Sequence, residues 1–198
     1  MAVGRRAEKM EATRASLMAA ARKAFAEKGY AEASMDDLTA AAGLTRGALY
    51  HNFGDKRGLL AAVVHQIDAE MAARAQAIAA RASTPWEGLL AEGGAYIEMA
   101  QEPEVQRIVL RDGPAVLGDP AQWPSQNACL ETTRRTVERL IADGVLKPVD
   151  PAATAWLING AALNAALWTA ASASPEQALP RAIETFRCLM QGLLAKPG

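Results

Sequence analysis

The chain has 198 residues, of which 51% are hydrophobic and 22% are charged. These values are close to those of average soluble proteins, so the composition excludes a disordered or fibrous chain, and the length allows a buried core. The net charge of −1 argues against indiscriminate nucleic-acid binding, but residues 1–60 carry ten Lys and Arg against seven Asp and Glu, whereas the rest carries eleven against fifteen.

The sequence predicts a cytoplasmic protein with no membrane partner. Its polar start lacks the apolar core of a secretion signal. The most apolar stretch, residues 152–173, is interrupted by Asn159 and Asn164 and predicts a buried helix rather than a membrane span. Cys129 and Cys188 are too few for a disulfide framework, so we expect small buried side chains, with a redox-sensing pair as the less favoured alternative.

Residues 14–28 have apolar side chains at a spacing of three to four and predict an amphipathic helix, which Gly29 ends. A serine three residues before an aspartate then begins a short helix over residues 35–42. Gly43 stops this helix, and a threonine cap opens another that ends at Phe53. Two short helices therefore meet at a glycine turn.

Apolar periodicity predicts further helices in the remainder of the chain, and Gly and Pro residues predict an irregular connection over residues 113–124. The predicted helices cover residues 55–81, 85–99, 103–112, a stretch ending before Gly144, 151–173 and 175–195. No stretch has the alternation typical of strands, and no internal repeat is evident. The fold class is all-α, with about nine helices.

The last two helices carry broad apolar surfaces. In the helix over residues 151–173, Trp156 and Trp168 lie on neighbouring apolar faces, so we expect it to be buried on two sides. Such helices suggest a dimer interface, but packing within one chain explains the pattern equally well.

The helices around the glycine turn have the size of a DNA-binding helix-turn-helix, in which the second helix enters the major groove by its first residues. Small residues there allow close approach, and Arg46 can donate two hydrogen bonds to guanine or pair with phosphate. We expect Thr45, Arg46, Gly47 and Ala48 at the bases, and Tyr50, His51 and Lys56 at phosphates.

A flexible basic arm is a further candidate for DNA contact, and it would consist of Arg5, Arg6 and Lys9. A plain helical hairpin with a solvated face is the alternative.

Residues 44–60, LTRGALYHNFGDKRGLL, resemble the recognition helix and following linker of TetR-type regulators. Residues 25–44, FAEKGYAEASMDDLTAAAGL, are similar to the first two helices of that family. Beyond residue 60 only helix number and chain length agree. Residues 107–118, RIVLRDGPAVLG, also resemble a sequence in one subgroup of these regulators.

The resemblance implies a repressor with a DNA-binding domain over residues 1–55 and a helical ligand-binding and dimerisation domain over residues 56–198. It adds Ser34 to the DNA surface. Members are homodimers through their last two helices and bind near-palindromic operators. A small-molecule effector is expected to shift the long helix that starts near Lys56 and to release the DNA.

A pocket for that effector is expected among the middle helices, with apolar walls and a few polar groups. The candidate lining residues are Met71, Tyr96, Met99, Arg107, Arg111, Trp123, Asn127, Glu131, Asn159 and Trp168. Ordinary structural roles compete with this interpretation. Trp123 and Trp168 also suit a core or an interface, Arg111 suits a pair with Asp112, and Asn159 suits a bond to the backbone.

An enzyme is the competing class. His51 lies inside the predicted recognition helix, and His65 with Asp68 suits an exposed surface pair better than a metal site. No catalytic motif occurs, so we expect no catalytic residues, no metal and no cofactor. A constitutive repressor, an activator or a nucleoid-associated dimer stays open, although the charge of −1 favours sequence-specific binding over architectural binding.

Overall fold

The chain folds into helices joined by short connections. The computed structural model describes the backbone of residues 2–195 and the side chains of residues 7–195. The helices are α1 (Ala2–Lys28), α2 (Met35–Ala41), α3 (Arg46–Phe53), α4 (Lys56–Ala79), α5 (Pro85–Met99), η1 (Val105–Asp112), α6 (Gly113–Leu117), η2 (Pro120–Gln122), α7 (Pro124–Ala142), α8 (Pro151–Ala171) and α9 (Pro175–Gln191). Within residues 2–195 there is no β-strand, only one isolated bridge between Leu146 and Leu194. The predicted all-α fold is confirmed.

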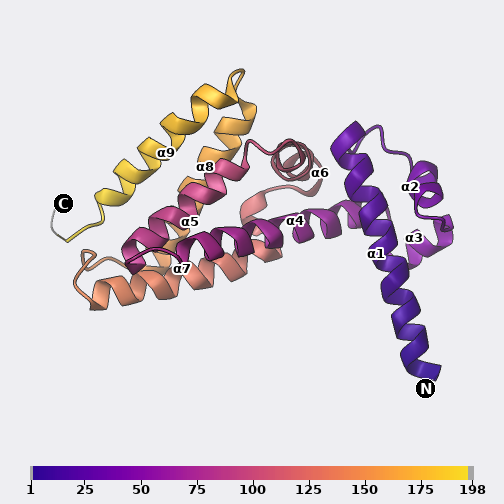
Figure 1. Ribbon diagram of the computed structural model, residues 1–198, viewed down its shortest axis with the longest axis horizontal. Coiled ribbons are helices and arrows are strands. Elements are labelled where there is room, and N and C mark those ends of the chain that lie inside the picture. Colours follow the sequence, from indigo (N-terminus) through magenta and orange to yellow (C-terminus); the bar gives the residue numbers. More distant parts are fainter. Residues whose placement is uncertain (1, 196–198) are drawn as a thin grey trace.

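The first three helices pack together at one end of the molecule (Figure 1). Phe25 of α1, Leu38 of α2 and Leu49 of α3 are fully buried against one another in a single apolar cluster. Gly29 ends the described run of α1 with φ 83°, a left-handed conformation that glycine adopts without strain. This packing presents α3 on the outside of the unit.

Helix α4 joins this unit to the remaining helices, and Figure 1 shows it crossing the gap between them. Its apolar stripe is buried from Leu59 to Ala75, and the same continuous cluster includes residues of α1, α3 and η1. Asp55 caps α4 by accepting a hydrogen bond from the backbone nitrogen of Gly58 at 2.6 Å.

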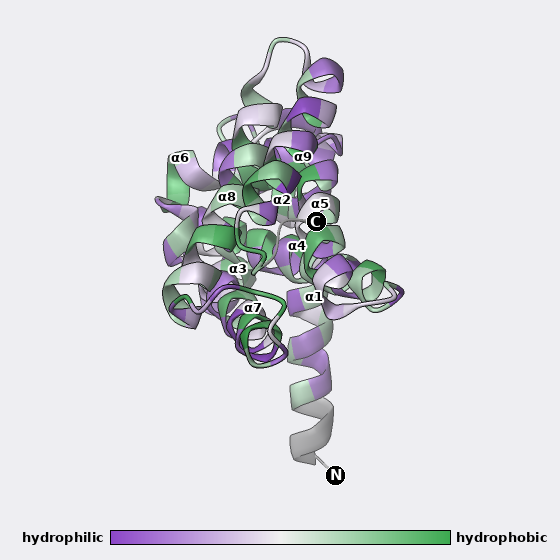
Figure 2. Cartoon of the chain, turned by 90° about the vertical axis from the view of Figure 1, so that its left-hand side faces the viewer, coloured by the Kyte–Doolittle hydropathy of each residue, from purple (hydrophilic) through white to green (hydrophobic). Residues whose placement is uncertain are grey.

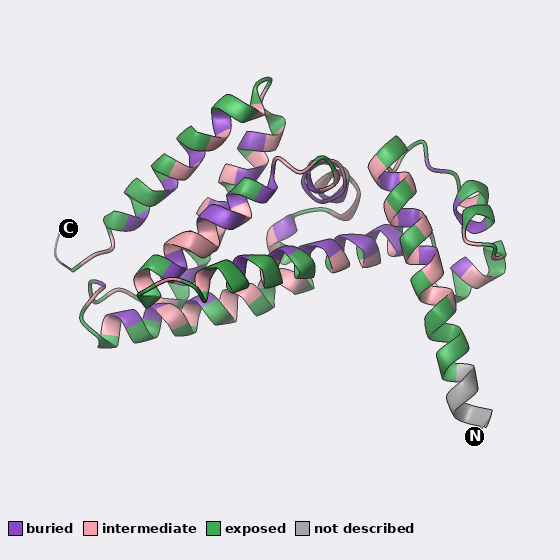
Figure 3. Ribbon diagram, viewed as in Figure 1, coloured by how far each residue is buried: buried purple, intermediate pink, exposed green. Residues whose placement is uncertain are grey.

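Helices α5, α7, α8 and α9 enclose a second apolar core. Ile97, Val137, Leu140 and Phe186 are buried at its centre. One face of α8 packs inward, but Trp156, Leu157 and Trp168 are exposed. The expectation that α8 is buried on two sides therefore fails within one chain, and Figure 3 shows the outer side of α9 largely exposed.

The stretch over residues 113–124 is more regular than its composition predicted. It contains α6 and η2. Pro114 lies in the first turn of α6, where its missing N–H is not needed. Gly113 does not break the helix. It leaves room for the ring of Trp123, because a Cβ at this position would lie 2.8 Å from Cη2 of Trp123. The preceding helix was predicted at residues 103–112 and is a π-helix, η1.

Helix α1 starts well before the predicted residue 14. Its described part begins at Ala2, so Lys9 lies on a helix and not in a flexible arm. The side chains of Arg5 and Arg6 lie outside the described residues. In Figure 2 the described early turns of α1 project from the molecule and are largely hydrophilic. Among residues 2–195 no helix is long and apolar enough to cross a membrane.

The junction of α3 and α4 depends on a close approach at Gly58. A Cβ at this position would lie 2.0 Å from the carbonyl oxygen of Phe53. We therefore expect Gly58→Ala to lower the free energy of unfolding by about 1–3 kcal/mol, measured by urea denaturation. Gly94→Ala in α5 is the control, because its Cβ would meet nothing within 4 Å. It should be neutral or stabilising by up to about 1 kcal/mol. Equal stability of the two variants would contradict the tight junction.

Candidate DNA interface and effector pocket

Helices α2 and α3 form a helix-turn-helix whose second helix begins at the surface. Gly43 forms the turn with φ 65°. The hydroxyl of Ser34 accepts a hydrogen bond from the backbone nitrogen of Asp37 at 3.0 Å, and that of Thr45 accepts one from Ala48 at 3.2 Å. Both helices are thus capped as predicted, and the caps fix the first turn of α3.

The residues predicted to contact DNA lie at the start of α2, along α3 and at the start of α4. Those with exposed side chains or backbone are Ser34, Thr45, Arg46, Gly47, Tyr50 and His51. Ala48 is half-buried. Their contacts with DNA remain predictions.

Lys56 is less free than the sequence suggested. Its Nζ lies 4.4 Å from the centre of the Tyr30 ring and donates a hydrogen bond to the carbonyl oxygen of Ala31 at 3.4 Å. Burial lowers the pKa of its ammonium group. The side chain therefore ties the start of α4 to the loop after α1.

Arg46 forms an ion pair with Asp36 of α2. Its Nε donates to Oδ1 of Asp36 at 2.5 Å, and its Nη2 donates to Oδ2. These hydrogen bonds lower the pKa of the Asp36 carboxyl group. The pair is side-on and bidentate, which fixes the plane of the guanidinium.

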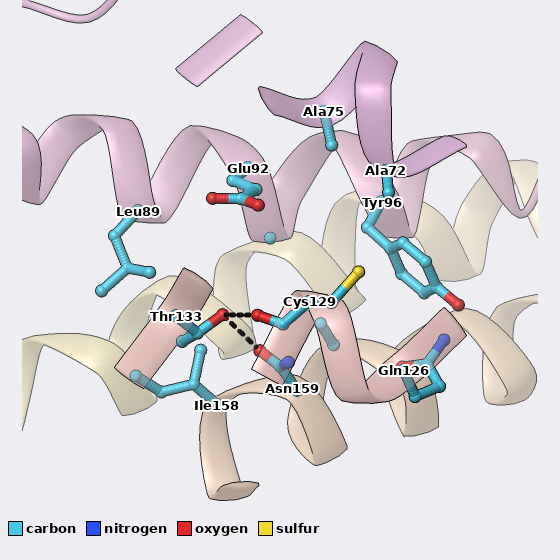
Figure 4. Close-up of a pocket in the computed structure, with 12 residues that line it drawn as sticks. Ala72, Ala75, Leu89, Glu92, Tyr96, Gln126, Cys129, Thr133, Ile158 and Asn159 are labelled. Atoms are coloured by element: carbon cyan, nitrogen blue, oxygen red, sulfur yellow. Dashed lines mark hydrogen bonds between the residues drawn. The ribbon is translucent and has the colours of Figure 1, made fainter. Parts of the chain in front are cut away.

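A pocket lies between α4, α5, α7 and α8. It has a volume of about 520 Å³, including the part open to solvent. Its apolar walls include Ala72, Ala75 and Leu89, and its polar groups include Glu92 and Tyr96 of α5 (Figure 4). The other lining residues are Gly93, Gln126, Cys129, Thr133, Ile158, Asn159 and Ala162. None of them is a Lys or Arg.

Hydrogen bonds order the polar side of the pocket. The hydroxyl of Thr133 lies 2.9 Å from Oδ1 of Asn159 and 3.0 Å from the carbonyl oxygen of Cys129, and these two acceptors share its one hydrogen (Figure 4). Beside the pocket, Nε2 of Gln126 donates to the carboxylate of Asp68 at 3.1 Å. These bonds hold α7 against α8 and α4.

Burial changes the acid–base properties of this region. It raises the pKa of the Glu92 and Asp68 carboxyl groups and of the Tyr96 hydroxyl. It also raises the pKa of the Cys129 thiol to about 11. A protonated thiol is a poor nucleophile, which argues against redox sensing at Cys129. Cys188 is exposed on α9, contrary to the expectation that both cysteines are buried.

The structure brings two of the ten predicted ligand-binding residues, Tyr96 and Asn159, into this pocket. Asn127 lines a neighbouring hollow between α7 and α8, with a volume of about 340 Å³ that includes the part open to solvent. Trp168 lies half-exposed on the outer side of α8, where it suits an interface. These two side chains are therefore separate from the main pocket.

The other candidates do not line this pocket. Met71, Met99 and Trp123 are buried in the apolar core. Glu131 is bound by Arg134 and Arg135, and these hydrogen bonds lower its pKa to about 2.

The last two candidates, Arg107 and Arg111, lie on the side of η1 that faces α1 and α8. Arg107 donates from Nη2 to the carbonyl oxygen of Lys28 at 2.6 Å, and with Arg111 it lines an open groove. Asp112 accepts a hydrogen bond from the backbone nitrogen of Tyr30.

Four polar lining residues were not predicted: Glu92, Gln126, Cys129 and Thr133. A signal existed for Glu92, because it shares a helical stripe with Leu89 and Tyr96, where an apolar residue is expected. The residues of α7 carried no such signal.

Asp68 is only 2% exposed, so the suggested surface pair with the exposed His65 is wrong. Its carboxylate instead faces α7 through Gln126. No group of three metal-binding side chains occurs in the described part of the chain.

The geometry defines a helix-turn-helix DNA-binding protein with a separate pocket. Residues 17–63 match the family model for bacterial regulatory proteins of the tetR family, and residues 86–193 match that for the tetracyclin repressor-like C-terminal domain. The chain belongs to the TetR family of transcriptional regulators. It is a DNA-binding regulator, and its relatives are regulators rather than enzymes.

Individual relatives agree with this assignment. A solved TetR-family regulator from Pectobacterium atrosepticum is 53% identical, with a TM-score of 0.89 over 96% of this chain and 98% of that one. The TetC protein of transposon Tn10 from Escherichia coli is 27% identical over 77% of this chain and 78% of its own length. The transcriptional repressor AcnR of Corynebacterium glutamicum is 42% identical, but the match covers only 30% of this chain and 32% of that repressor.

The buried carboxyl group of Asp68 makes stability depend on pH. Because burial raises its pKa, the folded protein binds this proton more tightly than the unfolded chain does. Stability is therefore lost as the pH rises above about 3.9, which is the pKa of an aspartate in an unfolded chain. We expect Asp68→Asn to raise the Tm at pH 7.5, with a smaller gain at pH 4.5, as measured by circular dichroism. Asp143→Asn, which removes an exposed charge, is the control. A lower Tm for Asp68→Asn at pH 7.5 would contradict this explanation.

Proposed function

We propose that the protein is a dimeric repressor that binds a near-palindromic operator and is released by a small molecule. One observation carries the proposal. Helix α4 lines the pocket with Ala72 and Ala75, and it begins next to the recognition helix α3. Ligand binding and DNA binding thus involve two ends of the same helix.

For DNA, we assign the first turn of α3 to the bases, through Thr45, Arg46, Gly47 and Ala48. We assign Ser34, Tyr50 and His51 to phosphates. Lys56 contacts phosphate only if it leaves Ala31, so we assign it first to positioning the loop after α1. Residues 1–55 then act as the DNA-binding domain, and residues 56–198 bind ligand and partner.

For dimerisation, we assign the outer face of α8 and α9. Leu157 and Leu189 are 74% and 64% exposed, and Trp168 lines a groove between the two helices, with a volume of about 780 Å³ that includes open solvent. Large apolar side chains gathered on one face favour burial against another protein surface. Dimers are typical of the family, and a second copy of this chain presents the same face.

For the effector, the pocket favours a small and largely apolar molecule with hydrogen-bonding groups. Tyr96, Gln126 and Asn159 supply donors and acceptors. Glu92 lies in the wall, and no basic residue balances it, which disfavours anions. We therefore expect neutral or cationic ligands.

Operator binding is tested with duplex DNA from upstream of the coding region and a scrambled duplex, at one salt concentration. Fluorescence anisotropy should show preferential binding to the upstream duplex, with an even number of protomers per duplex. Identical affinity for both duplexes would contradict sequence-specific repression at this site.

The dimer face is tested with Leu157→Glu. A charge at this exposed apolar position should weaken dimerisation by roughly 2–4 kcal/mol and should reduce operator binding in parallel. Ile78→Glu is the control, since Ile78 is also an exposed apolar residue but lies on α4. Sedimentation velocity should show monomers only for Leu157→Glu. Dimers of unchanged stability would place the interface elsewhere.

A further inference from the structure

The ion pair between Asp36 and Arg46 leaves a defined part of the guanidinium free. Nε and one hydrogen of Nη2 bind the carboxylate. The remaining donors are Nη1 and the second hydrogen of Nη2, which point along the other edge of the plane. Two parallel donors are the arrangement that matches O6 and N7 of guanine.

We propose that Asp36 is a positioning residue that sets Arg46 to read a guanine in each operator half-site. The inference rests on the proposed operator binding and assigns one base and one supporting residue within it. Asp36 itself touches no base. It acts by fixing the orientation of Arg46.

The location of the pair supports this role. Both side chains are more than half exposed, and exposed pairs contribute little to folding. Arg46 occupies the first position of α3, which enters the groove in a helix-turn-helix. Next to it, a Cβ on Gly47 would meet Thr45 Oγ1 at 3.7 Å and no side chain from another helix within 4 Å.

The carboxylate also affects discrimination between sequences. A free arginine pairs with any phosphate, whereas the carboxylate neutralises Arg46 and repels phosphates. Arg46 therefore contributes most to the free energy of binding where two acceptors of a base lie in the plane of its guanidinium. Specificity increases while affinity for random DNA falls.

The chain offers a matched control on the same helix turn. Asp37 is also exposed and acidic, but its carboxylate lies 3.8 Å from Nζ of Lys28, whereas Arg46 pairs with Asp36. Asp36→Asn and Asp37→Asn remove the same charge from the first turn of α2. Only the first removes the support of Arg46.

The test is selection of binding sites from a random duplex library with the full-length protein, followed by sequencing. Wild type should enrich a two-fold motif with a guanine at one position in each half-site. Asp36→Asn should lower the preference for that guanine by about tenfold, and Arg46→Ala and Arg46→Lys should abolish it. Asp37→Asn should retain the preference within about twofold, while both Asn variants bind random DNA more tightly. Circular dichroism melting checks that each variant is folded.

The outcomes separate the two proposals. If wild type enriches a motif and Asp36→Asn enriches it with the same guanine preference, the role of Asp36 is refuted and operator binding stands. If Arg46→Ala keeps the guanine, base reading by Arg46 is refuted. If Asp37→Asn loses the preference as strongly as Asp36→Asn, local charge and not positioning is responsible. If wild type enriches no motif, operator binding fails and this inference fails with it.

Discussion

The structure depends on the burial of one continuous stripe along α4. Leu59, Leu60, Val63, Val64, Ile67, Met71 and Ala75 are each at most 2% exposed, and they belong to the cluster that also contains Phe25 and Trp123. At roughly 1.5–3 kcal/mol for each large apolar side chain, this burial is the main force that joins the two parts of the molecule. The proposed domain boundary at residue 55 therefore coincides with a helix start and not with a gap in the core.

Polar contacts fix how the helices are oriented at this apolar junction. Arg22 of α1 donates from Nε to Glu104, next to η1, at 2.7 Å and from Nη1 to Glu70 of α4 at 2.8 Å. The backbone nitrogen of Tyr30 donates to Asp112 at 2.7 Å. Such charge-assisted bonds have narrow geometry, unlike apolar contacts. The end of α1 is thus hydrogen-bonded to α4, to η1 and to the residue before η1.

Local signals in the sequence predicted much of this fold. Caps at Ser34 and Thr45 and the glycine turn placed α2 and α3, because capping depends on residues close in sequence. Residues 113–124 were missed because Gly113 and Pro114 suit a helix start under Trp123 as well as a loop. The pocket was only partly predicted, since its walls come from four helices and include small residues such as Ala72. Likewise, Asp68 is buried because α7 packs against it, and this contact between distant segments cannot be predicted from the residues around Asp68.

The small side chains in the pocket wall suit the proposed coupling between ligand binding and the DNA-binding end of α4. Ala72 and Ala75 have no rotatable bonds that absorb the pressure of a ligand, so steric contact acts on the backbone of α4 itself. Ala72 lies 16 residues from Lys56, which corresponds to roughly 24 Å along a helix. Between them, Val63 and Ile67 are held in the shared core. In the proposed mechanism, a small displacement at the pocket would rotate α4 about this buried segment and move the start of α4 in the opposite sense. A coupling of about 1–3 kcal/mol per site is enough to change operator affinity by one or two orders of magnitude. That is a small part of the free energy of binding a small ligand, so the pocket needs no large rearrangement to act as a sensor.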